Sequence, residues 1–435
     1  MRYRNRTSGL SWRLPATAVA AVGLVAMALS VPAANASAST PAIPSAAFHQ
    51  TTGLTPTSVT VGNVSTLTGG LFLGAQVGAK AYADYINSTG GINGRRLIID
   101  GADDGYNNGE NNKALTAEDI NKDFALVGSF SLNDSYGGAV LAKNPSVPNV
   151  TVSLSEYTNQ LPNTFSPQPA DDGWELGPLT YFQKKYPSDV KHAAALVAGE
   201  PSAEAAFAGE KAAMKHLGYK VVYDPTFLIT QTDFTQNIIA MRNAGVKILF
   251  IEQMPENYAS AVFHALNQQN YHPVVVLGAS TYSNALIPAS GGASATDGAY
   301  LEQAASLYLG GDASDIPAVD TFQKWVQKAS PGFKPDLYTL YGWVSAQLFS
   351  QALAKAGKHP TRGSVLQALR STTSFSGSNL LATADPATKS PAECYIIARI
   401  QNGSFVRTDD TPVSGSNAGY RCDQPYYQSN GKETT

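Results

Sequence analysis

Short apolar runs alternate with longer stretches of helical periodicity along most of the chain. Residues 58–64 begin with the alternation typical of a strand, with Val59 and Val61 on one face. Residues 75–86 carry apolar side chains at i, i+4, i+7, i+8 and i+11, the apolar stripe of a helix. Residues 97–99 start another apolar run, so the chain is predicted to open as strand, helix, strand.

The same alternation continues toward the C-terminus. Further strands are expected at residues 125–128, 150–152, 192–197, 219–223, 248–251, 274–277, 300–309 and 395–400. Helices are expected at residues 111–122, 136–143, 203–217, 234–244, 258–267, 319–329, 337–356 and 362–369. Strands that alternate with helices imply parallel sheets covered on both faces. Two such runs, divided near residues 166–172, predict an α/β fold of two doubly wound parallel-sheet lobes.

The stretch INSTGGINGRRL at residues 86–97 joins the first helix to the second strand. Asn87 and the pair Gly90-Gly91 permit the left-handed backbone that ends a helix, and Asn93-Gly94 is a turn dipeptide. This stretch is therefore predicted to be a tight helix-to-strand turn, remote from any ligand.

The N-terminal region has the features of a secretory signal. Four arginines precede or open an apolar run at residues 16–29, and Ala34-Asn35-Ala36 resembles a cleavage site. Residues 1–36 are expected to be removed, residues 37–56 to form a flexible leader, and residues 429–435 a tail. The signal contains no cysteine, so the exported protein is expected in the periplasm, at the cell surface or secreted, without a lipid anchor.

Charge argues against nucleic acid and anionic membranes as partners. Without the four signal arginines, 26 basic residues stand against 33 acidic ones, a net charge of about −7. Cys394 and Cys422 are the only cysteines. In an oxidising compartment such a pair is interpreted first as a disulfide, with two free thiols as the alternative.

The usual signatures of catalysis are missing. The segment from Gly278 to Tyr282 lacks the second glycine of a nucleophile elbow, and no lysine-bearing phosphate loop or GxGxxG motif follows the first strand. Six histidines are scattered singly, so we expect no metal site and no cofactor: His49, His192, His216, His264, His272 and His359.

Small polar residues instead follow the expected strands. Residues 128–135 and 153–157 are rich in serine, and residues 251–253 and 278–282 stand at the equivalent ends in the second run. Hydroxyls and backbone N–H groups at the carboxyl edge of an open parallel sheet suit a carboxylate or amide ligand. Ordinary helix capping by serine and aspartate explains the same composition equally well.

The sequence resembles the leucine/isoleucine/valine-binding protein family over about residues 58–403. The most specific match is Asn-x-x-Gly-Gly-Ile-x-Gly at residues 87–94, preceded by a helix containing Gly78 to Tyr82. The loop Leu67-Thr68-Gly69 and the pair Asp233-Phe234 support it. The resemblance implies a type I periplasmic-binding-protein-like fold and the function of an extracytoplasmic solute receptor.

The resemblance also implies ligand contacts, which carry over unevenly. The carboxylate-binding loops fall on Phe130, Ser131 and Leu132 and on Ser153, Leu154 and Ser155; an aromatic wall falls on Leu73, a tyrosine on Ser202, and the acid for the ligand ammonium on Ser280. Glu252 is a candidate replacement for that acid, and Tyr282 is a candidate aromatic surface. Receptors for amides, urea and aromatic acids also belong to this family.

Three chain crossovers, near residues 166–172, 302–305 and 380–385, are expected to form the hinge. They would divide the mature chain into lobe 1 (residues 57–168 and 304–381) and lobe 2 (residues 169–303 and 382–428). A small ligand would close the cleft, and a monomeric receptor would present the closed form to an ABC permease. A sensing module for a membrane signalling partner and a secreted hydrolase are the alternative functions.

Overall fold

The computed structural model describes residues 41–106, 108–170, 173–251, 254–408 and 416–428. The expected signal peptide, the first residues of the leader, Glu252 and the C-terminal tail lie outside them. Within this part of the chain no helix has the length and apolar character needed to cross a bilayer.

The first lobe is built on a five-stranded sheet in which every pairing is parallel, in the order β2-β1-β3-β4-β5. Its strands are β1 (Ser58–Ser65), β2 (Arg96–Asp103), β3 (Leu126–Val127), β4 (Asn149–Val150) and β5 (Thr164–Phe165). The carboxyl ends of all five strands therefore meet at one edge of the sheet.

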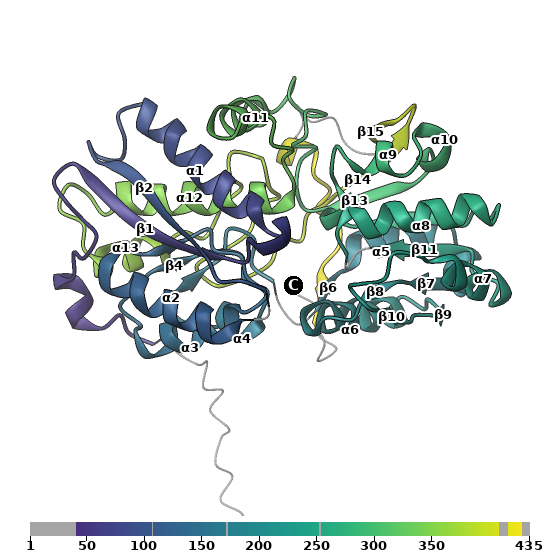
Figure 1. The fold of residues 1–435 in the computed structure, drawn as a ribbon, viewed down its shortest axis with the longest axis horizontal. Helices are drawn as coiled ribbons and strands as arrows, with labels where there is room; N and C mark the ends of the chain where they lie inside the picture. The colour runs from purple at the N-terminus through teal and green to yellow at the C-terminus, as the bar shows by residue number, and fades with distance from the viewer. Residues whose placement is uncertain (1–40, 107, 171–172, 252–253, 409–415, 429–435) are drawn as a thin grey trace, which may run out of the picture. The chain divides into compact units, whose positions relative to one another are not determined.

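Helices from both halves of the sequence cover this sheet (Figure 1). The early ones are η1 (Ser45–His49), η2 (Thr68–Gly70), α1 (Leu73–Ser88), α2 (Gly109–Lys122), α3 (Asp134–Lys143) and α4 (Glu156–Asn159). The late ones are α11 (Pro317–Ala329), α12 (Leu337–Lys355) and α13 (Arg362–Leu369). Because α12 packs along α1, two segments some 260 residues apart form one layer of the first lobe.

The second lobe is built on a seven-stranded sheet in the order β15-β14-β13-β12-β11-β7-β9. Its strands are β7 (Ala193–Ala195), β9 (Val221–Tyr223), β11 (Ile248–Ile251), β12 (Val274–Leu277), β13 (Tyr300–Gln303), β14 (Ile396–Gln401) and β15 (Ser404–Arg407). The first five are parallel, but β14 pairs antiparallel to β13, and β15 pairs antiparallel to β14. The sheet is therefore mixed at one edge, where the chain returns from the first lobe.

Further helices and short strands complete this lobe. The helices are α5 (Leu176–Lys185), η3 (Asp189–His192), α6 (Pro201–His216), α7 (Thr235–Asn243), α8 (Glu256–Gln268), η4 (Ala279–Thr281), α9 (Leu286–Ala289), α10 (Ala293–Thr296) and η5 (Ser416–Gly419). Two small sheets pair β8 (Val197–Ala198) with β10 (Thr226–Phe227), and β6 (Trp174–Glu175) with β16 (Tyr426–Tyr427).

Residues 86–97 form the tight turn from α1 to β2 that the sequence predicts. Gly90 and Gly91 have φ angles of 105° and 74°, and the side chain of Asn87 exchanges two hydrogen bonds of 2.8 Å with the backbone of Leu97. The Nδ2 of Asn93 donates to the carbonyl of Ala354 at 3.2 Å. The turn from α1 to β2 thus also contacts the C-terminal end of α12.

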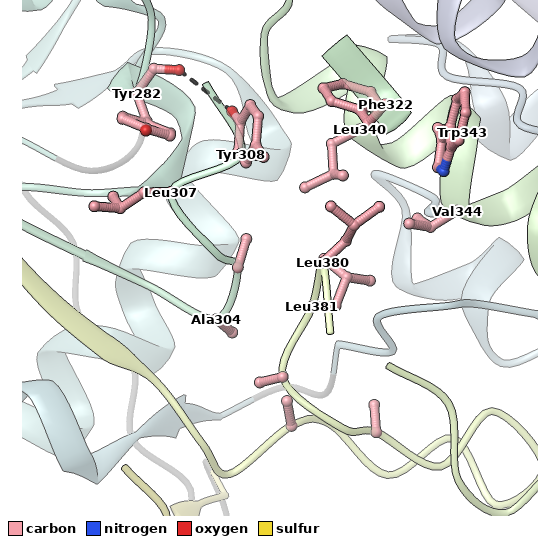
Figure 2. Close-up of a cluster of buried hydrophobic side chains, with 14 of the residues drawn as sticks. Tyr282, Ala304, Leu307, Tyr308, Phe322, Leu340, Trp343, Val344, Leu380 and Leu381 are labelled. Carbon is pink, nitrogen blue, oxygen red and sulfur yellow. Dashed lines mark hydrogen bonds between the residues drawn. The ribbon is translucent and has the colours of Figure 1, made fainter. Parts of the chain in front are cut away.

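The three expected crossovers are hydrogen-bonded to one another in the described residues. The carbonyl of Ala304 accepts from the N–H of Ala382 at 2.9 Å and from Nε2 of Gln168 at 3.4 Å, and the N–H of Ser306 donates to the carbonyl of Leu380 at 2.9 Å. Buried side chains fill the space around them (Figure 2): Leu307, Tyr308, Phe322, Leu340, Trp343, Val344, Leu380 and Leu381. The crossovers therefore share one apolar core.

Two expectations need correction. The described part of the leader is ordered, because Ala47 in η1 is fully buried and the carbonyl of Gln50 accepts from the N–H of Arg362 at 2.9 Å. The strand expected at residues 300–309 ends at Gln303. The apolar run continues because the second crossover is buried in the hinge core, and burial without regular pairing gives the same sequence pattern as a strand.

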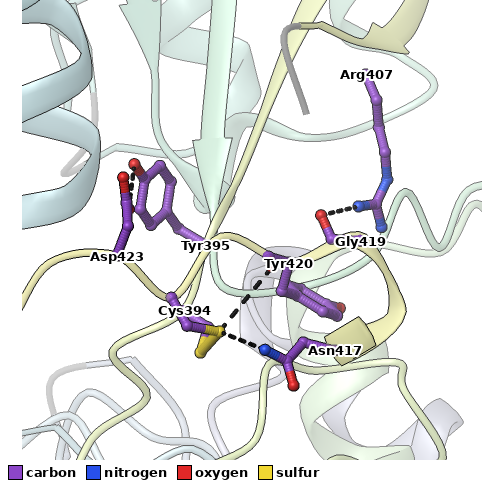
Figure 3. The surroundings of a disulfide bond; sticks show 8 residues. Cys394, Tyr395, Arg407, Asn417, Gly419, Tyr420 and Asp423 are labelled. Carbon is purple, nitrogen blue, oxygen red and sulfur yellow. Dashed lines mark hydrogen bonds between the residues drawn. A yellow bond between two sulfur atoms is a disulfide. The ribbon is translucent and has the colours of Figure 1, made fainter. Parts of the chain in front are cut away.

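Cys394 and Cys422 form a disulfide, which confirms the expected pairing (Figure 3). Tyr395 and Arg421, beside the two cysteines, exchange backbone hydrogen bonds of 2.9 and 2.8 Å. The hydroxyl of Tyr395 also donates to Asp423 at 3.2 Å. The disulfide thus fixes the C-terminal segment around Cys422 to the start of β14.

Replacing both cysteines by serine is expected to lower the free energy of unfolding by about 3 kcal/mol. The bond closes a loop with a sequence separation of 28 residues, and a loop of this size gives an effect of roughly that magnitude in the chain-entropy model. Urea unfolding of the Cys394→Ser/Cys422→Ser variant, with wild-type protein in dithiothreitol as the control, measures it. A loss below about 1 kcal/mol in both samples would contradict the estimate.

Candidate ligand-binding site

Aromatic side chains gather beyond the carboxyl edge of the five-stranded sheet. Phe72, Phe130 and Tyr338 are in mutual contact, with ring centroids 4.6–4.9 Å apart, and Tyr341 stacks on Phe130 at 5.9 Å. Apolar side chains surround these rings, namely Leu71, Ala75, Leu132, Val152 and Leu154. We call these four rings, together with the five apolar side chains around them, the aromatic cluster.

The strand ends and α12 bring the aromatic cluster together. Phe72 follows β1, Phe130 follows β3, and Val152 and Leu154 follow β4, so each lies in a loop at the same sheet edge. Tyr338 and Tyr341 lie one turn apart at the start of α12. The two tyrosines remain partly exposed, whereas Phe72 and Phe130 are each only 4 % exposed. A ligand at this edge would meet the tyrosines first.

A buried polar network fixes the loops beneath the rings. The hydroxyl of Ser131 donates to the carboxylate of Asp104 and accepts from Nδ2 of Asn112 at 3.2 Å and from the N–H of Asn133 at 2.8 Å. The hydroxyl of Thr66 donates to the same carboxylate at 2.8 Å. Ser131 therefore positions the loop backbone, and its hydroxyl is already engaged inside the first lobe.

The serines of the second loop differ from each other. The Oγ of Ser153 is buried and has no hydrogen-bond partner among the described residues. Ser155 instead caps α4, because its Oγ accepts from the N–H of Thr158 at 3.3 Å. The hydroxyl of Ser155 is thus used to cap a helix, whereas the hydroxyl of Ser153 is not engaged by any described residue.

The first turn of α12 is held by its own cap. The carboxylate of Asp336 accepts from the N–H of Thr339 at 2.8 Å and from its hydroxyl at 2.6 Å. Gly74 of α1 lies directly against this cap, because a Cβ at that position would be 2.2 Å from Oδ1 of Asp336. This close approach places Tyr338 against Phe72.

Carboxylates set the electrostatics around the tyrosines. Burial, with the carboxylate of Glu256 acting in the same direction, raises the pKa of Asp336 to about 6 despite its bonds to Thr339. Burial also raises the pKa of Glu175 to about 7. The pKa values of Tyr338 and Tyr341 are raised by burial first, then by Asp336 and Glu256 at Tyr338 and by Glu175 at Tyr341. The tyrosine hydroxyls are therefore neutral, and the carboxylates around them make the local electrostatic potential negative.

The remaining candidates lie elsewhere. Leu73 is 39 % exposed at the start of α1, one residue after Phe72. Ser202 is in the first turn of α6, and the hydroxyl of Ser280 donates to the carbonyl of Met254 at 2.9 Å. Tyr282 is a core residue, 3 % exposed and packed between Tyr308 and Phe405 (Figure 2).

Sequence reasoning missed Phe72, Tyr338 and Tyr341 as candidates. Phe72 sits one position before the residue chosen by family spacing. The pair Tyr338 and Tyr341 has the i, i+3 spacing that places two side chains on one face of a helix. That spacing, in the first turn of the expected helix at residues 337–356, was the available signal for an aromatic wall.

A two-lobed α/β protein whose crossovers share one core, with an apolar and aromatic site at a sheet edge, belongs to the class that binds small molecules between lobes. The chain is a member of the periplasmic binding protein family, whose model matches residues 58–404. This match confirms the resemblance indicated by residues 87–94. A search of curated proteins gave no significant match.

Solved structures with the same fold cover most of the chain. A branched-chain amino-acid ABC transporter protein from Thermus thermophilus with bound valine has a TM-score of 0.69 at 16 % identity, covering 84 % of this chain and 98 % of its own. A fatty-acid ABC transporter substrate-binding protein from Thermomonospora curvata has a TM-score of 0.67 at 17 % identity, with 87 % and 95 % covered. A solute-binding protein from R. palustris in complex with 4-hydroxybenzoate has a TM-score of 0.66 at 16 % identity, with 85 % and 98 % covered.

Proposed function

We propose that this protein is the extracytoplasmic receptor of an ABC importer and binds one small amphipathic molecule at the aromatic cluster. The ligand would bridge the two lobes and favour a closed form through its higher affinity for that form. A membrane permease would recognise the closed form, and no bond of the ligand would be made or broken.

The aromatic cluster is the observation that carries this proposal. Stacked and edge-on rings with aliphatic neighbours suit a branched aliphatic or aromatic body. The hydroxyl of Ser153, which follows β4 in the same loop as Leu154 and has no partner among the described residues, would donate to a polar head.

The carboxylates narrow the ligand class. Asp336 and Glu256 would repel an acid that carries no positive charge, and Glu175, whose pKa of about 7 leaves it about half ionised at neutral pH, would add a smaller repulsion. An amino acid or an amide is therefore favoured over a simple aromatic or fatty acid. The replacement of the family's acid by Ser280 is then compensated by these carboxylates. Leu73, Ser202 and Glu252 stay as secondary candidates for ligand contacts.

A thermal-shift screen of the mature protein tests the proposal. Amino acids, amides, urea, aromatic acids and small sugars would be the panel, because a ligand that binds the folded state raises the melting temperature by mass action. We expect shifts with apolar amino acids or their amides. Shifts confined to aromatic acids would overturn the ligand class, and shifts with none of the panel would favour the signalling alternative, for which permease and ATPase genes beside this one would be absent.

Tyr338→Ala is expected to weaken the best ligand of that screen at least tenfold. The substitution removes one ring of the aromatic cluster and opens the contact between Phe72 and Phe130, a loss of roughly 1.5 kcal/mol or more. Isothermal titration calorimetry measures the affinity, and Tyr157→Ala, at a tyrosine 51 % exposed on the same lobe, is the matched control. Equal affinity of both variants would place the ligand elsewhere.

A further inference from the structure

Three aspartates of the first lobe meet at a place that the proposed ligand does not use. Asp100 is on β2, Asp119 is in the last turn of α2, and Asp123 is the residue that ends α2. Each offers one carboxylate oxygen, and these oxygens all lie within 4.8 Å of one another. Gly62 on β1 is paired with Asp100, and a Cβ there would be 2.3 Å from Oδ2 of Asp119. The sheet therefore leaves room for this carboxylate.

Two of these carboxylates are buried with too few hydrogen-bond donors around them. Asp119 and Asp123 are each 2 % exposed, and the Oδ2 of each has no hydrogen-bond partner among the residues that the structure describes. Burying an ionised carboxylate is costly unless a cation or donors compensate it. Both side chains also lie at the C-terminal end of α2, where the helix dipole disfavours negative charge.

The nearby side chains of Lys122 and Arg362 do not fully compensate these buried carboxylates. The Nζ of Lys122 is shared among Asp100 at 2.9 Å, Glu118 at 3.0 Å and Asp119 at 3.4 Å. The guanidinium of Arg362 donates to the backbone carbonyls of Phe124, Ile120 and Asp123 rather than to a carboxylate of the group. When all four carboxylates are ionised, the two cations leave two negative charges, which one divalent ion would neutralise.

We propose that Asp100, Asp119 and Asp123 form a calcium site. Ca²⁺ takes six to eight oxygen ligands at roughly 2.3–2.6 Å in a flexible geometry, so three carboxylate oxygens within 4.8 Å of one another can all reach one ion. Mg²⁺ demands a near-ideal octahedron with ligands at about 2.0–2.1 Å and usually keeps several waters, which suits a largely buried set of three carboxylates less well. Asp100 is partly exposed, and water would enter from its side to complete the coordination.

The ion would act on stability and not on ligand recognition. Asp123 precedes β3, at the amino edge of the sheet, whereas the aromatic cluster lies beyond the carboxyl edge. Calcium would bind the end of α2, which packs on β1, to β2, the edge strand paired with β1. The inference is therefore independent of the proposed importer function.

Calcium chloride titrated into EDTA-treated mature protein tests the site. We expect binding heat in calorimetry, a rise in melting temperature, and at least tenfold weaker binding of magnesium chloride. Asp119→Asn/Asp123→Asn should weaken calcium binding at least tenfold. Glu118→Gln, which alters a carboxylate that contacts Lys122 but lies outside the three, should change it less than twofold.

Two results would overturn the proposal. One is a wild-type protein that gives neither heat nor a thermal shift at 10-fold or higher molar excess of calcium, up to about 10 mM, which is roughly ten times the Kd at the weak end of extracellular calcium modules. The other is unchanged affinity in the double variant. Should that variant fail to fold, Asp100→Asn, at a partly exposed position, must show the tenfold loss instead.

Discussion

Gly78→Val is expected to remove most of the stability of this protein, about 5 kcal/mol or more. Gly78 of α1 lies against the backbone of α12, and a Cβ there would be 1.9 Å from the carbonyl oxygen of Thr339. Gly342 of α12 makes the reciprocal contact, with a Cβ position 2.0 Å from the carbonyl oxygen of Ala75. Backbone atoms cannot turn aside as a flexible side chain can, so the helices must separate and the core between them opens.

Soluble yield and the midpoint of urea unfolding measure this effect. Lys80→Val is the matched control, because it places the same β-branched residue in the same helix at an exposed position, where roughly 1 kcal/mol or less is expected. Gly78→Ala should lie between the two. A Gly78→Val protein that unfolds at the wild-type urea concentration would show that α1 and α12 are not in this close contact.

Much of the second lobe could be predicted because its central strands are apolar on both faces. The strands expected at residues 248–251 and 274–277 coincide with β11 and β12, whose side chains are almost all buried. Helix α5 was not predicted, because its first turn contains Gly177 and Pro178. Proline in a first turn lacks only an N–H that has no helical partner anyway, so the helix forms despite this signal.

The candidate site was predictable only where it follows a strand directly. The loops that contain Phe130, Leu132 and Leu154 were predicted at the carboxyl edge because they follow strands of a parallel sheet, and the family resemblance singled out these residues within them. Tyr338 and Tyr341 reach that edge from a helix that begins more than 180 residues after Leu154. Their position depends on the contacts of Gly74 and Gly78 with α12, which a single sequence does not reveal.

The aspartate group was missed for a related reason. The expectation of no metal site rested on the scattered histidines, whereas Asp100 and Asp119 are brought together by the packing of α2 on β1 and the pairing of β1 with β2. Their spacing in the sequence matches no motif. Only the burial of Asp119 and Asp123, each with one oxygen that has no donor among the described residues, distinguishes the group from ordinary surface acids.

Arg362→Met is expected to lower the free energy of unfolding by about 4 kcal/mol. Arg362 is 4 % exposed, and its guanidinium donates to the carbonyls of Phe124 at 3.0 Å, Ile120 at 2.8 Å and Asp123 at 2.6 Å. Methionine fills a similar volume but donates nothing, so three buried carbonyls lose a charged partner at a cost of roughly 1–3 kcal/mol each, partly recovered by water.

Urea unfolding compares this variant with Arg242→Met. Arg242 also donates to a backbone carbonyl, that of Gln269 at 3.1 Å, from the end of a helix, but it is exposed. Water can replace that bond, so a loss below about 1 kcal/mol is expected. If both variants lost the same small amount, the guanidinium of Arg362 would not be what joins α13 to the end of α2. A large loss of unfolding free energy in Arg362→Met alone would show that the hydrogen bonds of Arg362 contribute strongly to the packing of the late segment of the first lobe against the early one.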